Sequence, residues 1–310
     1  MLMNNFKKSN YSISKFGLGT VQFGLDYGFT KRKSQEDANS ILQTAVENNV
    51  TLIDTAREYG DSEDKIGNFM KDYKNNFVVA TKLRLIDDLS NNLNYINLKK
   101  DIYNSVEESL GKLQLNKIPI LQLHQTVDEI YKNDDFWVII NQLKEDNLID
   151  LFGVSVYELS ETQFIAQNYN ECVDFFQIPY NIFDRRFDDI KKELDEYSIG
   201  LISRSTFLKG IIPCSIDDVP ECLNDIKPFK RELQNFANEC GCSTADLASV
   251  FVYYNDYINS TILGVNSPEE LENNINSIER FDENILKDID FDNLRVTDDY
   301  LIDPRKWDNF

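Results

Sequence analysis

Short apolar segments alternate with longer amphipathic segments along most of this 310-residue chain. The short segments are rich in Val, Ile, Leu and Phe and show little polar alternation, which is typical of strands that are buried on both faces. Eight such strands are predicted: Lys15–Thr20, Thr51–Asp54, Phe77–Lys82, Pro119–His124, Leu151–Val156, Phe175–Pro179, Gly200–Ser203 and Thr261–Val265.

Helices are predicted between these strands, because apolar residues recur there at helical spacing. The first of them begins with Ser34 and Asp37, which are typical residues for a helix start. The predicted helices are Ser34–Asn49, Ser62–Lys74, Leu98–Leu113, Asp134–Asn147, Ser160–Asn170, Asp184–Glu196 and Pro268–Arg280, with two more inside Lys227–Tyr254 that are broken at Gly241.

Strands that alternate with helices pair in parallel through βα crossovers. Eight such units favour a closed (β/α)8 TIM barrel over an open doubly wound sheet. An open sheet that binds a dinucleotide is expected to have a phosphate-binding G-x-G-x-x-G motif after its first strand. The segment Gly17-Leu18-Gly19-Thr20 lacks the third glycine of that motif. No internal repeat or low-complexity linker is visible, so residues 1–310 are expected to form a single domain. Residues 281–310 are expected to be an acidic C-terminal tail that packs on or near the barrel.

The chain has 32 Lys and Arg against 53 Asp and Glu, a net charge of −21. A surface this acidic repels nucleic-acid phosphates and anionic lipids, so neither is an expected partner. The start of the chain has no secretory apolar run, and the five cysteines are an odd number at irregular spacing, so we expect a cytoplasmic protein. Cys240 and Cys242 form a C-x-C pair that we interpret as free core thiols, and no metal site is expected.

Polar residues end three successive strands, at positions that a parallel barrel brings to one rim. Asp54 ends the second predicted strand, Lys82 the third and His124 the fourth, and Tyr59 follows Asp54 by five residues. Each of these residue types is more often structural when it occurs alone. Their joint occurrence at successive strand ends is what indicates a catalytic site.

The four residues suit the reduction of a carbonyl group. A carbonyl that accepts a hydride gains negative charge on its oxygen and needs a proton from a positioned acid. Tyr59 is too weak an acid, with an ordinary pKa of ~10, unless a cation such as Lys82 stabilises its phenolate. Asp54 supplies the counter-charge that keeps Lys82 protonated. Neutral His124 can donate a hydrogen bond that orients the carbonyl.

The sequence resembles the aldo-keto reductases over most of its length. Leu52-Ile53-Asp54-Thr55-Ala56, followed by Tyr59-Gly60-Asp61-Ser62-Glu63 and Ile66-Gly67, is similar to the segment that carries the family's catalytic Asp and Tyr. Thr81-Lys82 and Leu123-His124 fit the family's Lys and His positions. The resemblance implies a (β/α)8 barrel, a catalytic tetrad of Asp54, Tyr59, Lys82 and His124, and NADPH bound without a Rossmann domain.

The same resemblance implies where the cofactor binds. Gly19 and Thr20, with Asp54, would meet the nicotinamide end, and Ser155 and Gln177 would hold the carboxamide, although the family's next residue, Asn, is Val156 here. The pyrophosphate segment would include Ser203, Arg204, Ser205 and Gly210. The adenosine-phosphate signature would include Gly264, Asn266, Ser267, Glu270 and Asn274.

Three of these positions depart from the family. Arg204 replaces the usual aromatic residue, and it is either a cation near phosphate or substrate, or half of a structural ion pair. Asn266 stands where NADPH users carry Lys or Arg, and Glu270, if it faces the ribose, would repel the 2′-phosphate. The family default is NADPH, whereas Asn266 and Glu270 predict that NADH binds at least as well.

The segment Gly19–Gly28 and the tail Ile302–Trp307 resemble a bacterial subgroup that often accompanies polysaccharide or glycan biosynthesis. We therefore expect a sugar-like carbonyl substrate, in keeping with polar residues expected around the rim: Asp26, Tyr27, Arg84, Asp87 and Asn91. Two alternatives stay open. Lys82 could form a Schiff base in a lyase, or the chain could be a non-catalytic nicotinamide-binding partner protein, like the potassium-channel β subunits. The exact substrate and the oligomeric state cannot be read from the sequence.

Overall fold

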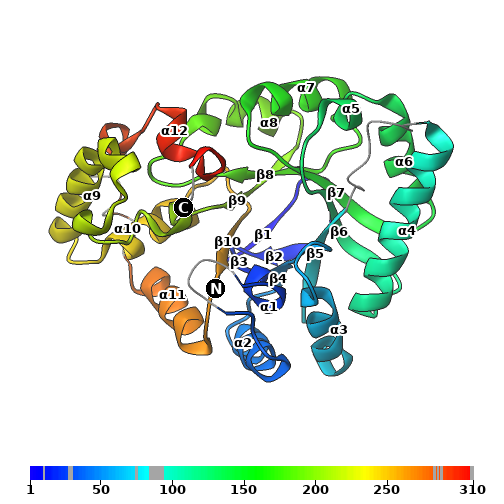
Figure 1. Cartoon of the computed structure of the whole chain (residues 1–310), viewed down its shortest axis with the longest axis horizontal. Helices are drawn as coiled ribbons and strands as arrows, with labels where there is room; N and C mark the ends of the chain where they lie inside the picture. The colour runs from blue at the N-terminus through cyan, green and yellow to red at the C-terminus, as the bar shows by residue number, and fades with distance from the viewer. Residues whose placement is uncertain are drawn as a thin grey trace.

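Parallel strands close into a barrel in the computed structural model, which describes residues 1–9, 11–26, 31–73, 76–83, 94–281, 284, 286 and 289–307 (Figure 1). The order around the barrel is β10-β3-β4-β5-β6-β7-β8-β9, and pairing of β10 with β9 closes it. The predicted TIM barrel is confirmed. Its strands are β3 (Phe16–Gly19), β4 (Leu52–Asp54), β5 (Val78–Leu83), β6 (Ile118–Leu123), β7 (Ile149–Ser155), β8 (Phe175–Pro179), β9 (Gly200–Arg204) and β10 (Ser260–Gly264).

Helices surround the barrel, and most of them agree with the prediction to within three residues (Figure 1). The main helices are α2 (Gln35–Glu47), α3 (Ser62–Tyr73), α4 (Tyr95–Leu113), α6 (Asp134–Glu145), α7 (Leu159–Tyr169), α9 (Lys227–Glu239), α10 (Thr244–Tyr253) and α11 (Pro268–Arg280). Short helices add to them at α1 (Val21–Gly24), α5 (Asp128–Tyr131), α8 (Lys191–Glu196) and α12 (Asp299–Ile302). None of the described helices is both long and apolar enough to cross a membrane.

The start of α2 shows why these helices begin where they do. The Ser34 side chain accepts a hydrogen bond from the Asp37 backbone N–H, and the Asp37 carboxylate accepts one from the Ser34 N–H. This capping box satisfies two backbone donors that would otherwise lack partners. Gly241, with φ of +66°, breaks the predicted helix pair between α9 and α10, as expected of a glycine.

The helix predicted over Asp184–Glu196 is wrong in its first half. A 3-10 turn covers Arg186–Asp189 there, and α8 has only six residues. The Asn181 side chain accepts the backbone N–H of Asp184, and the buried Asp184 carboxylate pairs with Arg186. Side chains that bond the local backbone compete with helix formation, so the first helical turn is replaced by this polar turn.

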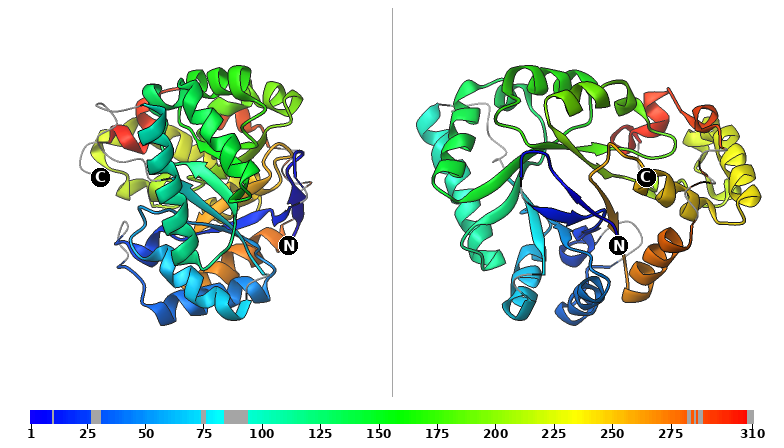
Figure 2. Two further views of the ribbon diagram at one scale, coloured as in Figure 1. Left: turned by 90° about the vertical axis from the view of Figure 1, so that its right-hand side faces the viewer. Right: turned by 180° about the vertical axis from the view of Figure 1, so that it is seen from behind.

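An antiparallel hairpin that the sequence analysis did not predict covers the amino-terminal end of the barrel. Its strands are β1 (Met3–Asn5) and β2 (Ser12–Ser14), and the right-hand view of Figure 2 shows it across the back of the barrel. Phe6 stacks on Phe175, the first residue of β8, with ring centroids 5.1 Å apart. Phe6 and Ile13 are fully buried, so the hairpin fills the base of the barrel with apolar side chains.

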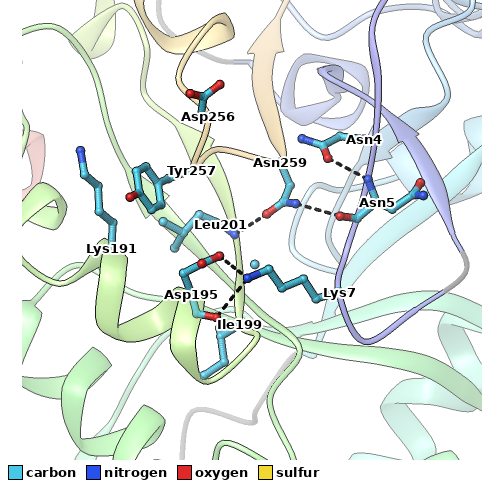
Figure 3. Close-up of a pocket in the computed structure, with 11 residues that line it drawn as sticks. Asn4, Asn5, Lys7, Lys191, Asp195, Ile199, Leu201, Asp256, Tyr257 and Asn259 are labelled. Atoms are coloured by element: carbon cyan, nitrogen blue, oxygen red, sulfur yellow. Dashed lines mark hydrogen bonds and ion pairs between the residues drawn. The ribbon is translucent and has the colours of Figure 1, made fainter.

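Polar contacts fix this hairpin to the base (Figure 3). Lys7 pairs with Asp195 of α8, with 2.5 Å between Nζ and Oδ1. The Asn259 side chain donates to the carbonyl of Asn5 at 3.1 Å and accepts the backbone N–H of Leu201 at 2.8 Å. The hairpin is therefore joined to residues that lie about two hundred positions or more further along the chain.

The tail packs beside the other end of the barrel. Leu294, Val296, Leu301, Ile302 and Trp307 are buried in one cluster with residues that follow β8 and with α9 and α10. The Val296 N–H donates to the carbonyl of Phe183 at 2.9 Å. A 3-10 turn over Pro304–Lys306 follows α12, so the tail reaches the loops at the carboxyl ends of the strands.

Candidate active site

The carboxyl ends of β4 and β5 bring Asp54 and Lys82 into direct contact. Lys82 Nζ lies 2.7 Å from Asp54 Oδ2 and also donates to the carbonyl of Thr55 at 2.9 Å. Lys82 is only 1% exposed. Burial lowers its pKa below the ordinary value, whereas Asp54 acts in the opposite direction and favours the charged ammonium.

The second oxygen of Asp54 is held by two glutamines. Gln122 Nε2 donates to Asp54 Oδ1 at 3.1 Å, and Gln177 Nε2 donates to the same atom at 2.8 Å. All three side chains are buried. Gln122 is not among the residues predicted from the sequence, although a polar side chain inside the apolar β6 segment is the signal that could have found it. Gln177, predicted to hold the carboxamide, binds Asp54 in this structure.

Tyr59 lies against the same ammonium. Lys82 Nζ is 5.3 Å from the centre of the Tyr59 ring, and the half-buried Tyr59 ring meets the His124 ring edge to face at 5.8 Å. The structure therefore brings all four predicted tetrad residues together at one rim, as the barrel geometry requires.

Close packing with a glycine fixes the turn that carries Tyr59. A Cβ on Gly24 in α1 would lie 1.6 Å from the Tyr59 carbonyl oxygen. Gly60, with φ of +57°, has a left-handed backbone conformation that glycine adopts without strain. Both glycines let α1 and the Tyr59 turn approach more closely than other residues would allow.

His124 is mostly buried, with its side chain 19% exposed. Burial, helped by the positive charge of Lys82, lowers its pKa from 6.5 to about 4, while Asp54 opposes the shift. Glu58 Oε2 lies 2.8 Å from His124 Nδ1, although the angle is not that of a hydrogen bond. The imidazole is thus neutral near pH 7, as the sequence analysis required for a hydrogen-bond donor to a carbonyl.

A pocket of about 350 Å³ opens beside the tetrad, a volume in the range of small-molecule sites. It runs from Tyr59 past the ends of β9 and β10 to the start of α11. Predicted cofactor residues that line it are Gly19, Thr20, Asp54, Gln177, Arg204, Ser205, Gly210, Gly264, Asn266 and Glu270. It is also lined by residues that sequence reasoning missed, among them Gln22, Phe207, Lys209 and Pro213.

Other predicted cofactor residues do not line this pocket. Ser155 is buried and lies in register with Gln177 on the neighbouring strand, and Asn274 is half-buried on α11. The Ser203 hydroxyl donates to Thr261 inside the barrel wall. Ser267 caps α11 by accepting the Glu270 N–H at 3.1 Å.

The Ser205–Gly210 turn has an unusual backbone. Ser205, Leu208 and Lys209 have φ between +46° and +64°, and Gly210 has φ of +93°. Left-handed residues other than glycine store strain and are commonest at functional sites. The turn forms one wall of the pocket, where the pyrophosphate segment was predicted.

Glu270 folds back from α11 toward the pocket. Its Oε2 accepts the backbone N–H of Asn266 at 2.6 Å. The side chain thus carries negative charge to the start of α11, the end of a helix that otherwise attracts phosphate. The Asn266 N–H, which could otherwise donate a hydrogen bond to a phosphate oxygen, donates to Glu270 instead.

The residues of this pocket suit a nicotinamide dinucleotide. Gly19 and Gly264 line it, with the side chains of Ile262 and Gln22 packed against them. The Ser205–Gly210 turn and the start of α11, which suit phosphate groups, lie further along the same pocket. These residues would hold a dinucleotide along the pocket, which extends from Tyr59 to Asn266 and Glu270.

Comparison with known families agrees with this geometry. The model of the aldo/keto reductase family matches residues 15–291. The chain belongs to the aldo/keto reductase family. The predicted family resemblance is confirmed, whereas membership of the polysaccharide-associated subgroup stays a prediction.

Relatives in this family include bacterial and fungal proteins. "Uncharacterized oxidoreductase YqkF" of Bacillus subtilis is 26% identical over 66% of this chain and 64% of its own length. "Aldo-keto reductase YhdN" of the same species is 29% identical over 57% of this chain and 53% of its own length. The chain thus spans less than two thirds of either Bacillus protein. A Schizosaccharomyces pombe protein named "Putative voltage-gated potassium channel subunit beta" is 25% identical over 91% of this chain and 90% of its own length.

Solved structures support the fold of this aldo/keto reductase family member. PA4992 of Pseudomonas aeruginosa, titled as a "putative aldo-keto reductase", has a TM-score of 0.67 and 19% identity, with 92% of this chain and 96% of that chain covered. At this identity the likeness concerns the barrel alone. The family is one of NAD(P)H-dependent oxidoreductases that act on small carbonyl compounds.

Part of the predicted substrate rim falls outside the described residues. These positions are Tyr27, Arg84, Asp87 and Asn91. Asp26 is described: it is exposed, and it accepts hydrogen bonds from the Lys31 side chain at 2.7 Å and the Arg32 backbone at 2.8 Å.

Proposed function

We propose that this chain is an NAD(P)H-dependent carbonyl reductase in which Tyr59 donates the proton. The observation that carries the proposal is the buried Lys82 ammonium, which contacts Asp54 on one side and the Tyr59 ring on the other. A buried lysine needs a function or a strong counter-charge to be retained, and here it is held beside a phenol that would become a phenolate.

The residues divide the chemistry as follows. The bound reduced nicotinamide supplies the hydride to the carbonyl carbon. His124, neutral because its pKa is about 4, donates a hydrogen bond that orients the carbonyl oxygen. Tyr59 gives its hydroxyl proton to that oxygen as negative charge develops. Lys82 stabilises the resulting phenolate, and Asp54 keeps Lys82 charged.

A spectrophotometric screen tests this proposal. Wild-type protein is mixed with NADPH or NADH and a panel of aldehydes, keto sugars and nucleotide-linked sugars, and loss of reduced cofactor is followed. Tyr59→Phe is expected to lower turnover by ~10²–10⁴-fold while cofactor affinity is kept. Tyr103→Phe is the matched control, because Tyr103 lies on α4 and bonds Asp146 outside the site. Near-full turnover by Tyr59→Phe would reject the mechanism.

The proposed substrate is sugar-like and hydroxylated. The support is the subgroup resemblance together with the polar groups of the pocket, such as Gln22, Ser205 and Asn266. Better catalytic efficiency with sugar-like carbonyls than with benzaldehyde-type compounds is the expected result of the screen. A cytoplasmic location belongs to the same proposal, and the five free thiols suit a reducing compartment.

The non-catalytic alternative has one observation in its favour, the relative named as a potassium channel β subunit. The assembled tetrad favours turnover over this alternative. A protein that binds nicotinamide cofactor but oxidises it with none of the carbonyls would support the partner-protein role. Borohydride trapping of a substrate on Lys82 would support the lyase instead.

A further inference from the structure

Arg204 ends β9 but its side chain reaches across to the loop after β7. Its guanidinium carbon lies 4.0 Å from the centre of the Tyr157 ring, and Nη2 donates to the carbonyl of Val156 at 3.1 Å. Because β8 separates β7 from β9, the guanidinium crosses the carboxyl end of β8. Arg204 also lines the pocket that contains Tyr59.

The tail holds this arrangement in place. The Arg305 guanidinium lies 3.6 Å from the centre of the same Tyr157 ring. Two guanidinium groups this close to one ring centre cannot share a face, so Tyr157 lies between Arg204 and Arg305. The backbone N–H of Tyr157 donates to Glu161 at 2.6 Å, which anchors the loop. Arg204 is thus held in a fixed orientation before any ligand binds, and its side chain loses little freedom on binding.

Among the described residues, Arg204 differs from the neighbouring arginines in having no ion-pair partner. Arg305 pairs with Asp303 and Glu158, and Arg186 pairs with Asp184. Over the described residues, no carboxylate lies within 4.0 Å of the Arg204 guanidinium, which favours the reading of Arg204 as a cation near phosphate or substrate over that of a structural ion pair. The chain has a net charge of −21, so acidic partners for a structural arginine are plentiful. An arginine that lines the pocket without such a partner is suited to bind an anion.

The position of Arg204 relative to the tetrad indicates whether its anion belongs to the substrate or to the cofactor. Its positive charge contributes to the lowered pKa of both His124 and Lys82, so it lies within electrostatic range of the reacting carbonyl. The adenosine end of the pocket, at Asn266 and Glu270, begins beyond β10 on the other side of β9. Arg204 and Tyr59 line the same pocket, so an anion that Arg204 holds beside the reacting carbonyl would belong to the carbonyl compound.

We propose that Arg204 binds a carboxylate or phosphate group on the substrate, so that the enzyme prefers anionic carbonyl compounds to neutral ones. This inference rests on the proposed carbonyl reduction. Arginine presents its N–H groups as a fork that matches both anions. Val156 and Tyr157 orient that fork, and a neutral sugar would leave it without a charged partner.

Matched substrate pairs test the inference. Succinic semialdehyde is compared with its methyl ester, and glyceraldehyde 3-phosphate with glyceraldehyde, so that the two pairs separate carboxylate from phosphate. The measured quantity is the ratio of kcat/KM for the anion to that for its neutral partner. Arg204→Met is expected to lower this ratio by roughly 10–100-fold for at least one pair, as expected for losing a hydrogen bond to a charged group. Arg204→Lys should recover part of the preference.

Arg295→Met is the control variant, because it removes a guanidinium that pairs with Asp189 and does not line the pocket. It is expected to change the ratio by only a few fold. The affinities of NADP⁺ and NADPH are measured in parallel for each variant. If Arg204→Met weakens dinucleotide binding and leaves the ratio unchanged, the arginine serves the cofactor phosphate and the inference is overturned.

A binding experiment separates failure of this inference from failure of the proposed function. Succinate and inorganic phosphate, which have no carbonyl to reduce, are titrated into wild type and Arg204→Met in the presence of NADP⁺ by calorimetry. Binding that is lost in Arg204→Met supports the anion site even if no carbonyl in the screen is reduced. Equal binding by both proteins, or binding by neither, overturns the site whatever the turnover results show.

Discussion

Glu58 places a carboxylate oxygen 2.8 Å from Nδ1 of His124, the only histidine in the chain. Burial and Lys82 hold the pKa of His124 at about 4, and a nearby carboxylate favours the imidazolium. Asp54 is the carboxylate that opposes this shift, so Asp54→Asn is expected to lower the His124 pKa further, whereas Glu58→Gln, which changes a side chain that is 43% exposed, is expected to change the pKa less. Because there is a single histidine, NMR of histidine-labelled protein reports it without assignment. Glu47→Gln, an exposed change on α2, is the control. A wild-type pKa at or above 6.5 would contradict the predicted environment.

The same ring makes stability depend on pH. The unfolded chain takes up a proton at His124 below its ordinary pKa of 6.5, whereas the folded protein does so only near 4. The unfolded state thus binds more protons in this window, and stability falls as the pH drops from 6.5 to 4. The contribution is about 3 kcal/mol at most. Urea unfolding of wild type and His124→Gln at several pH values isolates it, and parallel curves for the two proteins would refute it.

Lys82 and Asp54 should behave as a coupled pair. Lys82→Met leaves the buried Asp54 carboxylate without its cation, and loss of one partner of a buried pair costs about 3–5 kcal/mol. Gln122 and Gln177 still donate to Asp54 and reduce that cost. Adding Asp54→Asn should restore stability but not turnover, because Tyr59 still lacks its cation. Unfolding curves and turnover rates are compared for both variants. Recovery of turnover in the double variant would show that Lys82 does not act on Tyr59.

Cofactor preference follows from the start of α11. Glu270 lines the pocket and accepts the Asn266 N–H, so a 2′-phosphate meets negative charge and loses a donor. NADH is expected to bind at least as tightly as NADPH, and Asn266→Arg with Glu270→Gln should shift the preference toward NADPH. One unit-charge pair at ~4 Å amounts to roughly 4 kcal/mol at an effective dielectric of 20, and to far less at a screened surface. Titration of both cofactors at fixed salt measures this. A much tighter NADPH constant in wild type would mean that another cation, such as Lys209, holds the phosphate.

The barrel and the tetrad could be predicted because both depend on local patterns. The strands are mostly apolar, and Asp54, Lys82 and His124 stand at successive strand ends, so the parallel topology alone brings them together. Gln122 escaped notice because its role depends on a contact with Asp54, 68 positions away. Whether Arg204 has an ion-pair partner could not be predicted from the sequence either. Whether a carboxylate lies beside it is a property of the folded loops after β7 and β9.

The unpredicted hairpin and the wrongly predicted helix start have the same physical origin. Residues 1–14 are polar and short of apolar alternation, so the hairpin that holds Phe6 against Phe175 has no signal of its own. The Asp184–Glu196 segment has helical spacing, but the buried Asp184–Arg186 pair and Asn181 redirect its first turn. In both cases tertiary contacts override the local pattern.

The hairpin at the base also sets an order of events during protein synthesis. Asn5 is held by Asn259, and the two residues are 254 positions apart. At roughly 5–20 residues added per second, the ribosome needs about 13–50 s to go from one to the other. Throughout that interval Phe6 and Ile13 have no completed barrel to cover, and the growing chain carries an exposed apolar hairpin. Closing the base of the barrel therefore has to follow the synthesis of Asn259 and is among the last steps of folding.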